Sequence, residues 1–302
     1  MRKYFLTLED VKKSEILEIF RLAKYFKKKR VINLLKDKTF FLFFEELSIL
    51  TEISFNIAIQ QLNGKIVSFS SRISKKHFKD ILKVLEKYVD LFIFGVNEHK
   101  TLKLATEIVD TPIVNASSNL SNPCQALSDM FTIKERFKSL RGLKLAYIGI
   151  PDNICNSLLL ACTKLGIDIS IACPPRFKPN KDFINLARKY SKITKAEVKI
   201  TKNPEKAAKD ANVIYTTSSF GSKKGKKIPS RYKVTEKLFE LANSDCVFMH
   251  SLPINRGEEV TSKVVDSFRS IIFEQAENKL YVLKAIFVEM LPETLIKLKL
   301  HL

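Results

Sequence analysis

The chain has 302 residues, 45% of them hydrophobic and 28% charged, so it is long enough for two domains and too apolar to be disordered. Its 52 basic and 32 acidic residues give a net charge of +20, which would suit nucleic acid or an acidic partner, but the basic residues are dispersed along the chain. No apolar run approaches the ~18 residues that cross a bilayer, and the start MRKYFLTLED turns acidic too soon for a signal peptide, so a cytoplasmic location without a membrane partner is expected.

In the first half of the chain, segments with strand character alternate with segments of helical periodicity. An opening helix is predicted over 7–29, where Thr7 can act as the N-cap. Strands are predicted over 38–45, 65–71, 90–96 and 112–118, and helices over 51–62, 75–89, 99–109 and 122–140. We expect the long helix 122–140 to run between two domains.

The second half of the chain restarts the same alternation. Strands are predicted over 142–151, 168–175, 196–201, 212–218, 246–253 and 269–276, and helices over 153–166, 182–194, 203–211 and 278–291. Strands that alternate with helices in both halves predict an α/β protein with two doubly wound parallel-sheet domains.

Metal and cofactor signals are weak throughout the chain. The five cysteines are Cys124, Cys155, Cys162, Cys173 and Cys246; they form no CxxC pair, and the four histidines lie far from one another. Neither structural zinc nor a disulfide framework is expected, and the thiols are predicted to be reduced and buried. The turn GIPDN lacks the three-glycine dinucleotide fingerprint, so we expect no cofactor.

Ligands of parallel α/β sheets bind at the carboxyl ends of the strands. The candidate site walls are therefore the turns after Phe44, Gly149, Tyr215 and His250. The first of these turns has the form of an anion site, because the first N–H groups of a helix lack partners and the helix dipole favours negative charge. Yet no lysine or arginine lies between residues 43 and 64, where Glu45, Glu46 and Glu52 stand instead.

The segment NPCQALSDMFTIKERFKSLRGLKLAYIG resembles the His-Pro-Cys-Gln-Ala-Leu helix and the following strand of the aspartate/ornithine carbamoyltransferase (transcarbamylase) family, and its ornithine branch most closely. The segments NICNSLLLACTKLGIDISIA, NVIYT, FMHSLPINRGEEVT and FEQAENKL match in the same order. The resemblance covers essentially the whole chain. It implies a carbamoyl-phosphate-type domain over 1–133, an amino-acid (ornithine)-type domain over 134–280, and a C-terminal helix over 281–302 that packs back on the first domain.

The resemblance also implies a homotrimer with active sites between subunits, and carbamoyl phosphate and an amino acid as ligands. In such enzymes a neutral amine attacks the carbonyl of carbamoyl phosphate and phosphate leaves. Arginines suit the phosphate, because their forked donors match its oxygens.

The family's phosphate turn, Ser-Thr-Arg-Thr-Arg, corresponds to Ser48, Ile49, Leu50, Thr51 and Glu52. The two hydroxyls remain, and they could also cap the helix 51–62. The arginine that clamps the phosphate has become leucine. Ile49 and Leu50 are therefore lost ligand positions.

The rest of the implied donor site has changed as well. A further phosphate arginine aligns with Gly95, a third lost position, and the histidine that donates to the carbonyl oxygen aligns with Asn122. Gln125 is kept, and the arginine of the family's Ala-Glu-Asn-Arg motif is Lys279. The loop contributed by a neighbouring subunit should lie within 71–88, which is shorter than in the family and has no glycine.

On the amino-acid side, Asn153 and Leu252 match the ornithine-branch pattern. The family's aspartate after VIYT is Thr217, its Ser-Met-Gly segment aligns around Ser222, and the cysteine of His-Cys-Leu-Pro is Ser251. The loss of that aspartate and cysteine predicts a weaker hold on the reacting amine. Structural roles are expected for Cys124 (packing), for His250 (orienting the HSLP turn), and for Arg256, Glu258 and Glu259 (closing a loop and capping a helix).

Three hypotheses follow. The first is a carbamoyltransferase of reduced or altered activity that uses Ser48, Thr51, Gln125 and Lys279 for the donor and Asn153 and Ser251 for the acceptor. The second is a non-catalytic paralogue, a pseudoenzyme that acts as a structural or regulatory subunit, alone or with an active transcarbamylase. The third, a binder of another acidic ligand or of nucleic acid, is disfavoured because the basic run SKKGKK at 222–227 has no interleaved aromatic residues.

Overall fold

A computed structural model describes residues 3–29, 31–45, 48–69, 75–218 and 229–299. The chain forms two compact units, which we call the first unit (1–128 with 278–302) and the second unit (129–277). The divisions fall inside helices α5 (Pro123–Phe137) and α11 (Ile272–Met290), so each of these helices contributes residues to both units.

The first unit is built on a parallel sheet of five strands. They are β1 (Tyr4–Phe5), β2 (Thr39–Phe44), β3 (Lys65–Phe69), β4 (Leu91–Gly95) and β5 (Ile113–Ser117), in the order β1-β5-β4-β2-β3. Apart from Thr39 at the start of β2, the strands β2 and β4 are apolar and buried, as expected of parallel strands covered on both faces. The edge strand β3 is largely exposed.

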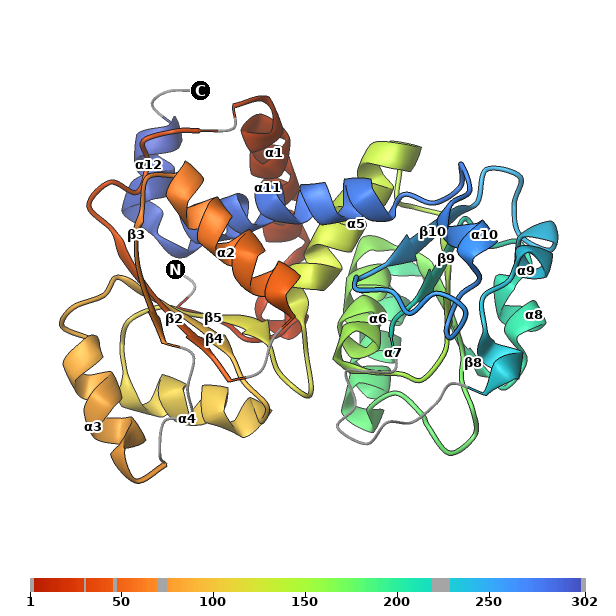
Figure 1. Cartoon of the computed structure of the whole chain (residues 1–302), viewed down its shortest axis with the longest axis horizontal. Coiled ribbons are helices and arrows are strands. Elements are labelled where there is room, and N and C mark those ends of the chain that lie inside the picture. Colours follow the sequence, from red (N-terminus) through yellow and green to blue (C-terminus); the bar gives the residue numbers. More distant parts are fainter. Residues whose placement is uncertain (1–2, 30, 46–47, 70–74, 219–228, 300–302) are drawn as a thin grey trace. The chain divides into compact units, whose positions relative to one another are not determined.

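Helices cover both faces of this sheet. They are α1 (Lys13–Lys28), α2 (Ile49–Gln61), α3 (Lys75–Leu85), α4 (His99–Ile108) and α12 (Pro292–Lys299), with a 3₁₀ turn over Leu8–Asp10. Figure 1 shows α3 and α4 on one face and α1 and α2 on the other. The ring of Phe287 on α11 lies 5.4 Å from that of Phe40 and 6.0 Å from that of Phe55, so α11 packs on both β2 and α2.

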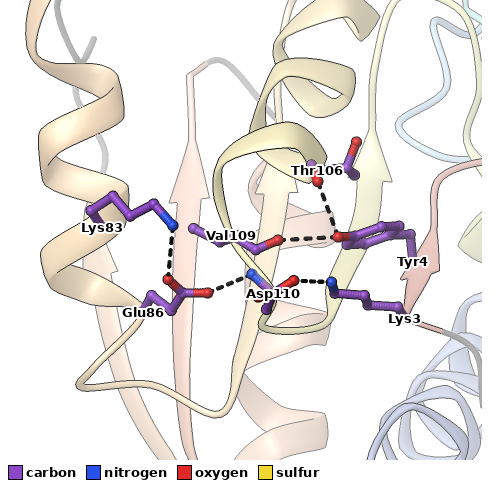
Figure 2. A network of polar contacts seen from close by, with 7 residues as sticks. All are labelled: Lys3, Tyr4, Lys83, Glu86, Thr106, Val109 and Asp110. Atoms are coloured by element: carbon purple, nitrogen blue, oxygen red, sulfur yellow. Dashed lines mark hydrogen bonds and ion pairs between the residues drawn. The ribbon is translucent and has the colours of Figure 1, made fainter.

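A polar network ties together the amino-terminal side of the same sheet (Figure 2). The Tyr4 hydroxyl donates to the carbonyl oxygens of Thr106 (3.0 Å) and Val109 (3.1 Å) at the end of α4. The backbone N–H of Asp110 donates to the Glu86 carboxylate, while the Asp110 carboxylate pairs with Lys3. These contacts join β1, the end of α3 and the end of α4, and leave the carboxyl ends of the strands available for ligands.

The second unit repeats the architecture. Its strands are β6 (Lys144–Ile148), β7 (Asp168–Ala172), β8 (Val198–Thr201), β9 (Val213–Thr216) and β10 (Val247–His250), all parallel, in the order β10-β9-β6-β7-β8. Its helices are α6 (Asn153–Leu165), α7 (Lys181–Thr194), α8 (Pro204–Ala208), α9 (Glu236–Glu240) and α10 (Ser262–Val265), with a 3₁₀ turn over Ser230–Tyr232. Figure 1 shows α6 and α7 on one face of the sheet and α8, α9 and α10 on the opposite side.

The predicted fold class, two parallel-sheet α/β domains, is confirmed. The strand predicted over 269–276 is wrong: only Ser270 bridges to Phe248 of β10, and α11 begins at Ile272. Thr7 caps the short 3₁₀ turn rather than α1, which begins at Lys13. The elements β1, α9 and α10 were not predicted. The single C-terminal helix predicted over 281–302 is instead divided between α11, which ends at Met290, and α12. Within the described ranges, no helix is both long and apolar enough to span a membrane.

Candidate functional site

The turn after β2 leads into α2, which begins at Ile49, two residues earlier than the 51–62 prediction. Ser48 holds the N-cap position, but its side chain makes no capping hydrogen bond. Thr51 lies inside the first turn, and its hydroxyl accepts a hydrogen bond from the Lys279 ammonium (3.1 Å). The expectation that the Ser48 and Thr51 hydroxyls cap this helix is therefore wrong.

Lys279 brings a buried cation to the start of α2. Its side chain comes from α11 and is only 7% exposed. The pKa of the Cys124 thiol on α5 is raised to about 12 by burial, an effect that the Lys279 charge opposes. Thr51 and Lys279 are thus in contact at the amino end of α2, where the helix dipole also favours an anion.

The two lost positions on α2 face solvent. The side chain of Ile49 is 71% exposed and that of Leu50 47%. Ile53 and Ile57, one and two turns further along, are exposed as well. Residues 49, 50, 53 and 57 therefore form one apolar stripe along α2, which offers no hydrogen-bond donor to a phosphate.

The acidic turn has a structural role at the carboxyl ends of β2 and β4. The Gly95 carbonyl accepts the N–H of Glu45 (2.9 Å), and the Glu45 carboxylate accepts the N–H of Asn97 (2.6 Å). A side-chain carboxylate thus occupies a backbone donor just beyond β4. The Glu45 carboxylate therefore lies next to position 95, where the resemblance implies an arginine that binds the phosphate.

Asn122 and Gln125 are both buried at the beginning of α5. The Asn122 side-chain oxygen accepts the N–H of Gln125 (3.2 Å), which is the N-cap interaction. Asn122 therefore stabilises the helix start, at the position where the family has its carbonyl-polarising histidine. The thiol of Cys124 is fully buried and donates to the carbonyl of Asn115 (3.5 Å), in agreement with the predicted packing role.

In the second unit, a hydroxyl cluster lies at the carboxyl ends of β6 and β9. The hydroxyl oxygens of Tyr147 and Thr217 are 2.8 Å apart, and the Tyr147 hydroxyl also donates to the Ile150 carbonyl (2.9 Å). The Asp152 carboxylate lies 3.4 Å from the Tyr147 hydroxyl and accepts a hydrogen bond from Thr217. The neutral residue that replaces the family aspartate is thus in direct contact with a carboxylate.

Asp152 is also the N-cap of α6. Its Oδ1 atom accepts the N–H groups of Ile154 (3.0 Å) and Cys155 (2.9 Å), and Asn153 is the first residue of the helix. Burial raises the pKa of the Asp152 carboxyl, although these hydrogen bonds and those from Thr217 and Tyr147 favour its ionised form. The sequence interpretation missed Asp152, although an aspartate directly before a helical run is itself an N-cap signal.

The turn after β10 is organised by His250. Its Nδ1 accepts the N–H of Leu252 (3.0 Å), and its Nε2 lies 3.2 Å from the Glu259 carboxylate, both side chains being fully buried. The N–H of His250 donates to the Gln275 side chain (2.9 Å). These contacts support the predicted orienting role of His250. They present half-buried Ser251 and Leu252 at the same sheet edge as Thr217, with a cis peptide bond before Pro253.

The loop after this turn is closed by polar contacts of Arg256 and Glu259, as predicted. The helix-capping role expected for the same segment is wrong, because Thr261 caps α10. The Arg256 guanidinium pairs bidentately with Asp266 (2.7 Å for both contacts), and the Glu259 carboxylate accepts the N–H of Asn255 (2.8 Å). Of the remaining predicted positions, Ser222 lies outside the described residues. The interval 71–88 is described only from residue 75, where α3 begins.

The model of the family "Aspartate/ornithine carbamoyltransferase, carbamoyl-P binding domain" matches residues 3–135, and that of the "Asp/Orn binding domain" matches residues 141–290. The chain is 41% identical over 297 residues to an ornithine carbamoyltransferase of Methanococcus aeolicus, with 94% of this chain and 98% of that one covered. Among solved structures, the ornithine carbamoyltransferase of Pyrococcus furiosus matches with a TM-score of 0.90 at 34% identity (95% and 96% covered). The anabolic enzyme of Campylobacter jejuni matches with a TM-score of 0.88 at 35% identity (95% and 99% covered).

Proposed function

Because the chain belongs to the aspartate/ornithine carbamoyltransferase family, we propose that it is an ornithine-carbamoyltransferase-like protein in which standard citrulline synthesis is reduced, altered or lost. The family reaction joins the amine nitrogen of an amino acid to the carbonyl carbon of carbamoyl phosphate. The bond from that carbon to the phosphate oxygen breaks, and phosphate leaves. The protein has to hold a dianion, polarise a carbonyl and place the amine in line.

The observation that carries this proposal is the first turn of α2. Its N–H groups and the Thr51–Lys279 pair favour an anion. However, the outward positions carry Ile49 and Leu50, and the nearby backbone donor of Asn97 is taken by Glu45. A phosphate here would have Lys279 and the hydroxyls of Ser48 and Thr51 in place of a set of arginine forks.

The size of the effect follows from the three replaced ligands, at Leu50, Gly95 and Asn122. A hydrogen bond to a charged group contributes about 1.5–3 kcal/mol, so three of them correspond to roughly 5–9 kcal/mol if they add. At about 1.4 kcal/mol per tenfold change, that is roughly three to six decades of transition-state stabilisation. Residual activity at a low level, or none, is the expected outcome.

Calorimetric titration of the purified protein with carbamoyl phosphate, at moderate salt and neutral pH, tests the proposal without a guess about the acceptor. We expect binding no tighter than millimolar, together with little or no citrulline formation from L-ornithine. Micromolar binding with rapid citrulline formation would show that other residues rebuild the donor site, and would refute the proposal.

The exposed apolar stripe of α2 favours a second candidate function, a non-catalytic subunit. Ile49, Leu50, Ile53 and Ile57 expose hydrophobic surface where a soluble monomer would carry polar groups. The neighbouring edge strand β3 also exposes Val67 and leaves one edge of its backbone without a strand partner within the described sheet. In this second proposal, the surface is covered by another subunit, either a copy of this chain in a homotrimer or an active transcarbamylase paralogue.

Light scattering of the purified chain tests this assembly. We expect a trimer that Ile53→Asp dissociates, while Leu104→Asp, which alters an equally exposed leucine on α4, leaves it intact. A wild-type monomer that becomes a trimer only with an active paralogue would favour the regulatory subunit. A monomer in both conditions would refute the subunit function.

A further inference from the structure

We propose that Asp152 is the positioning residue that holds the side-chain amine of the acceptor, in place of the aspartate that the family carries at position 217. The inference rests on the proposed function, in that the second unit is taken to bind an amino acid. It specifies the acceptor class as an α-amino acid with a primary amine on its side chain.

The first argument is geometric. Thr217 ends in a hydroxyl, but that hydroxyl donates to the Asp152 carboxylate and lies 2.8 Å from Tyr147. The carboxylate of this chain, Asp152, therefore lies in the turn after β6, whereas the family aspartate lies in the turn after β9. These two strands are neighbours in the sheet. The Asp152 carboxylate thus places a negative charge within hydrogen-bond distance of Thr217, the position where the resemblance implies an aspartate.

The second argument concerns the partners of this carboxylate. It accepts hydrogen bonds from two backbone N–H groups and from the Thr217 hydroxyl, and the Tyr147 hydroxyl lies 3.4 Å away. In the part of the chain that the structure describes, no lysine or arginine makes an ion pair with Asp152. A half-buried carboxylate without a counter-cation is stabilised in its ionised form by a cationic ligand that binds next to it.

The third argument is convergence. Asn153 follows Asp152 directly, and the strand order β10-β9-β6 places the turn of Ser251 and Leu252 at the same edge. Asn153, Ser251 and Leu252 are each half-buried, so part of each remains exposed. The rigid α6 N-terminus, which Asp152 itself caps, fixes the carboxylate relative to this turn, which suits a group that orients an amine.

Amino-acid binding with and without the side-chain amine tests the inference. L-ornithine and L-norvaline share their carbon skeleton and differ in that amine. Calorimetric titrations of the full chain are run with each amino acid, in the presence and absence of inorganic phosphate. We expect wild-type protein to bind L-ornithine at least tenfold more tightly than L-norvaline.

Asp152→Asn keeps an N-cap oxygen and nearly the same shape while it removes the charge. We expect this variant to lose the preference for L-ornithine while its affinity for L-norvaline changes less than twofold. Asp182→Asn, which makes the same chemical change at an exposed site in the first turn of α7, should keep the preference. The double variant Asp152→Asn with Thr217→Asp returns the carboxylate to the family position and should recover it.

A preference for L-ornithine that survives in Asp152→Asn would overturn the inference, as would a wild-type protein that binds neither amino acid up to tens of millimolar. The carbamoyl phosphate titration is independent of Asp152. Its outcome therefore decides the proposed donor-site loss separately from the acceptor-site inference.

Discussion

Replacing Leu50 with arginine is the most direct test of the proposal that the donor site is weakened at this position. Leu50 lies in the first turn of α2 and its side chain is 47% exposed, so a longer side chain can be accommodated without disturbing the core. A cation near a helix N-terminus costs about 0.3–1 kcal/mol of folding stability. This cost is present in both the free and the bound protein, so it does not reduce the gain in affinity.

The gain in affinity follows from one charge-assisted contact. Such a hydrogen bond contributes about 1.5–3 kcal/mol. Because position 50 is half exposed, solvent screening favours the lower end of this range. About 1.5 kcal/mol corresponds to roughly tenfold tighter binding of carbamoyl phosphate.

The assay is calorimetric titration with carbamoyl phosphate, repeated with inorganic phosphate, for wild type, Leu50→Arg and Ile57→Arg. Ile57 is exposed on the same helix but lies about 10 Å further along its axis, near the limit of unscreened charge effects at moderate salt. We expect roughly tenfold tighter binding for Leu50→Arg and less than twofold for Ile57→Arg. Equal effects of the two arginines would refute the assignment of position 50 to the phosphate site.

Three further changes test individual contacts. Thr51→Val removes the hydroxyl that accepts from buried Lys279, and should lower the unfolding free energy by about 1–3 kcal/mol in urea titrations; unchanged stability would mean that the contact is dispensable. Tyr147→Phe leaves buried acceptors without their donor and should cost a similar amount, seen as a fall in Tm of about 2–4 °C per kcal/mol; a Tm within 1 °C of wild type would contradict this. The backbone N–H of Asp110 holds the pKa of Glu86 below its ordinary value of 4.5, so this stabilisation is present above pH ~4.5 and is lost as the pH falls through the folded-state pKa. The Tm difference between wild type and Glu86→Gln should therefore be largest near pH 6 and shrink below pH 4, and a difference independent of pH would oppose the assignment.

Local sequence patterns were sufficient for most of the regular structure, because apolar periodicity and turn residues act over a few neighbouring positions. The short segment 269–276 was one exception. Its apolar run suits either a strand or a buried helix, and the choice depends on packing. The ladder to β10 continues only at Ser270, after which the chain enters α11 at Ile272 and buries Phe287 against Phe40 and Phe55.

The sequence by itself determined which side chains stand at the motif positions: motif order placed Leu50, Gly95 and Thr217 where the family resemblance implies two arginines and an aspartate, and no packing can change those residue types. The tertiary structure decided what the remaining groups do. It brought Lys279 to Thr51 across 228 positions of sequence, directed Glu45 onto a backbone donor, and placed the Asp152 carboxylate against Thr217. The physical reason is that hydrogen bonds and charges act over a few ångströms in space. Which side chains come that close depends on the order in which the parallel strands pair and on how the helices pack on the sheet.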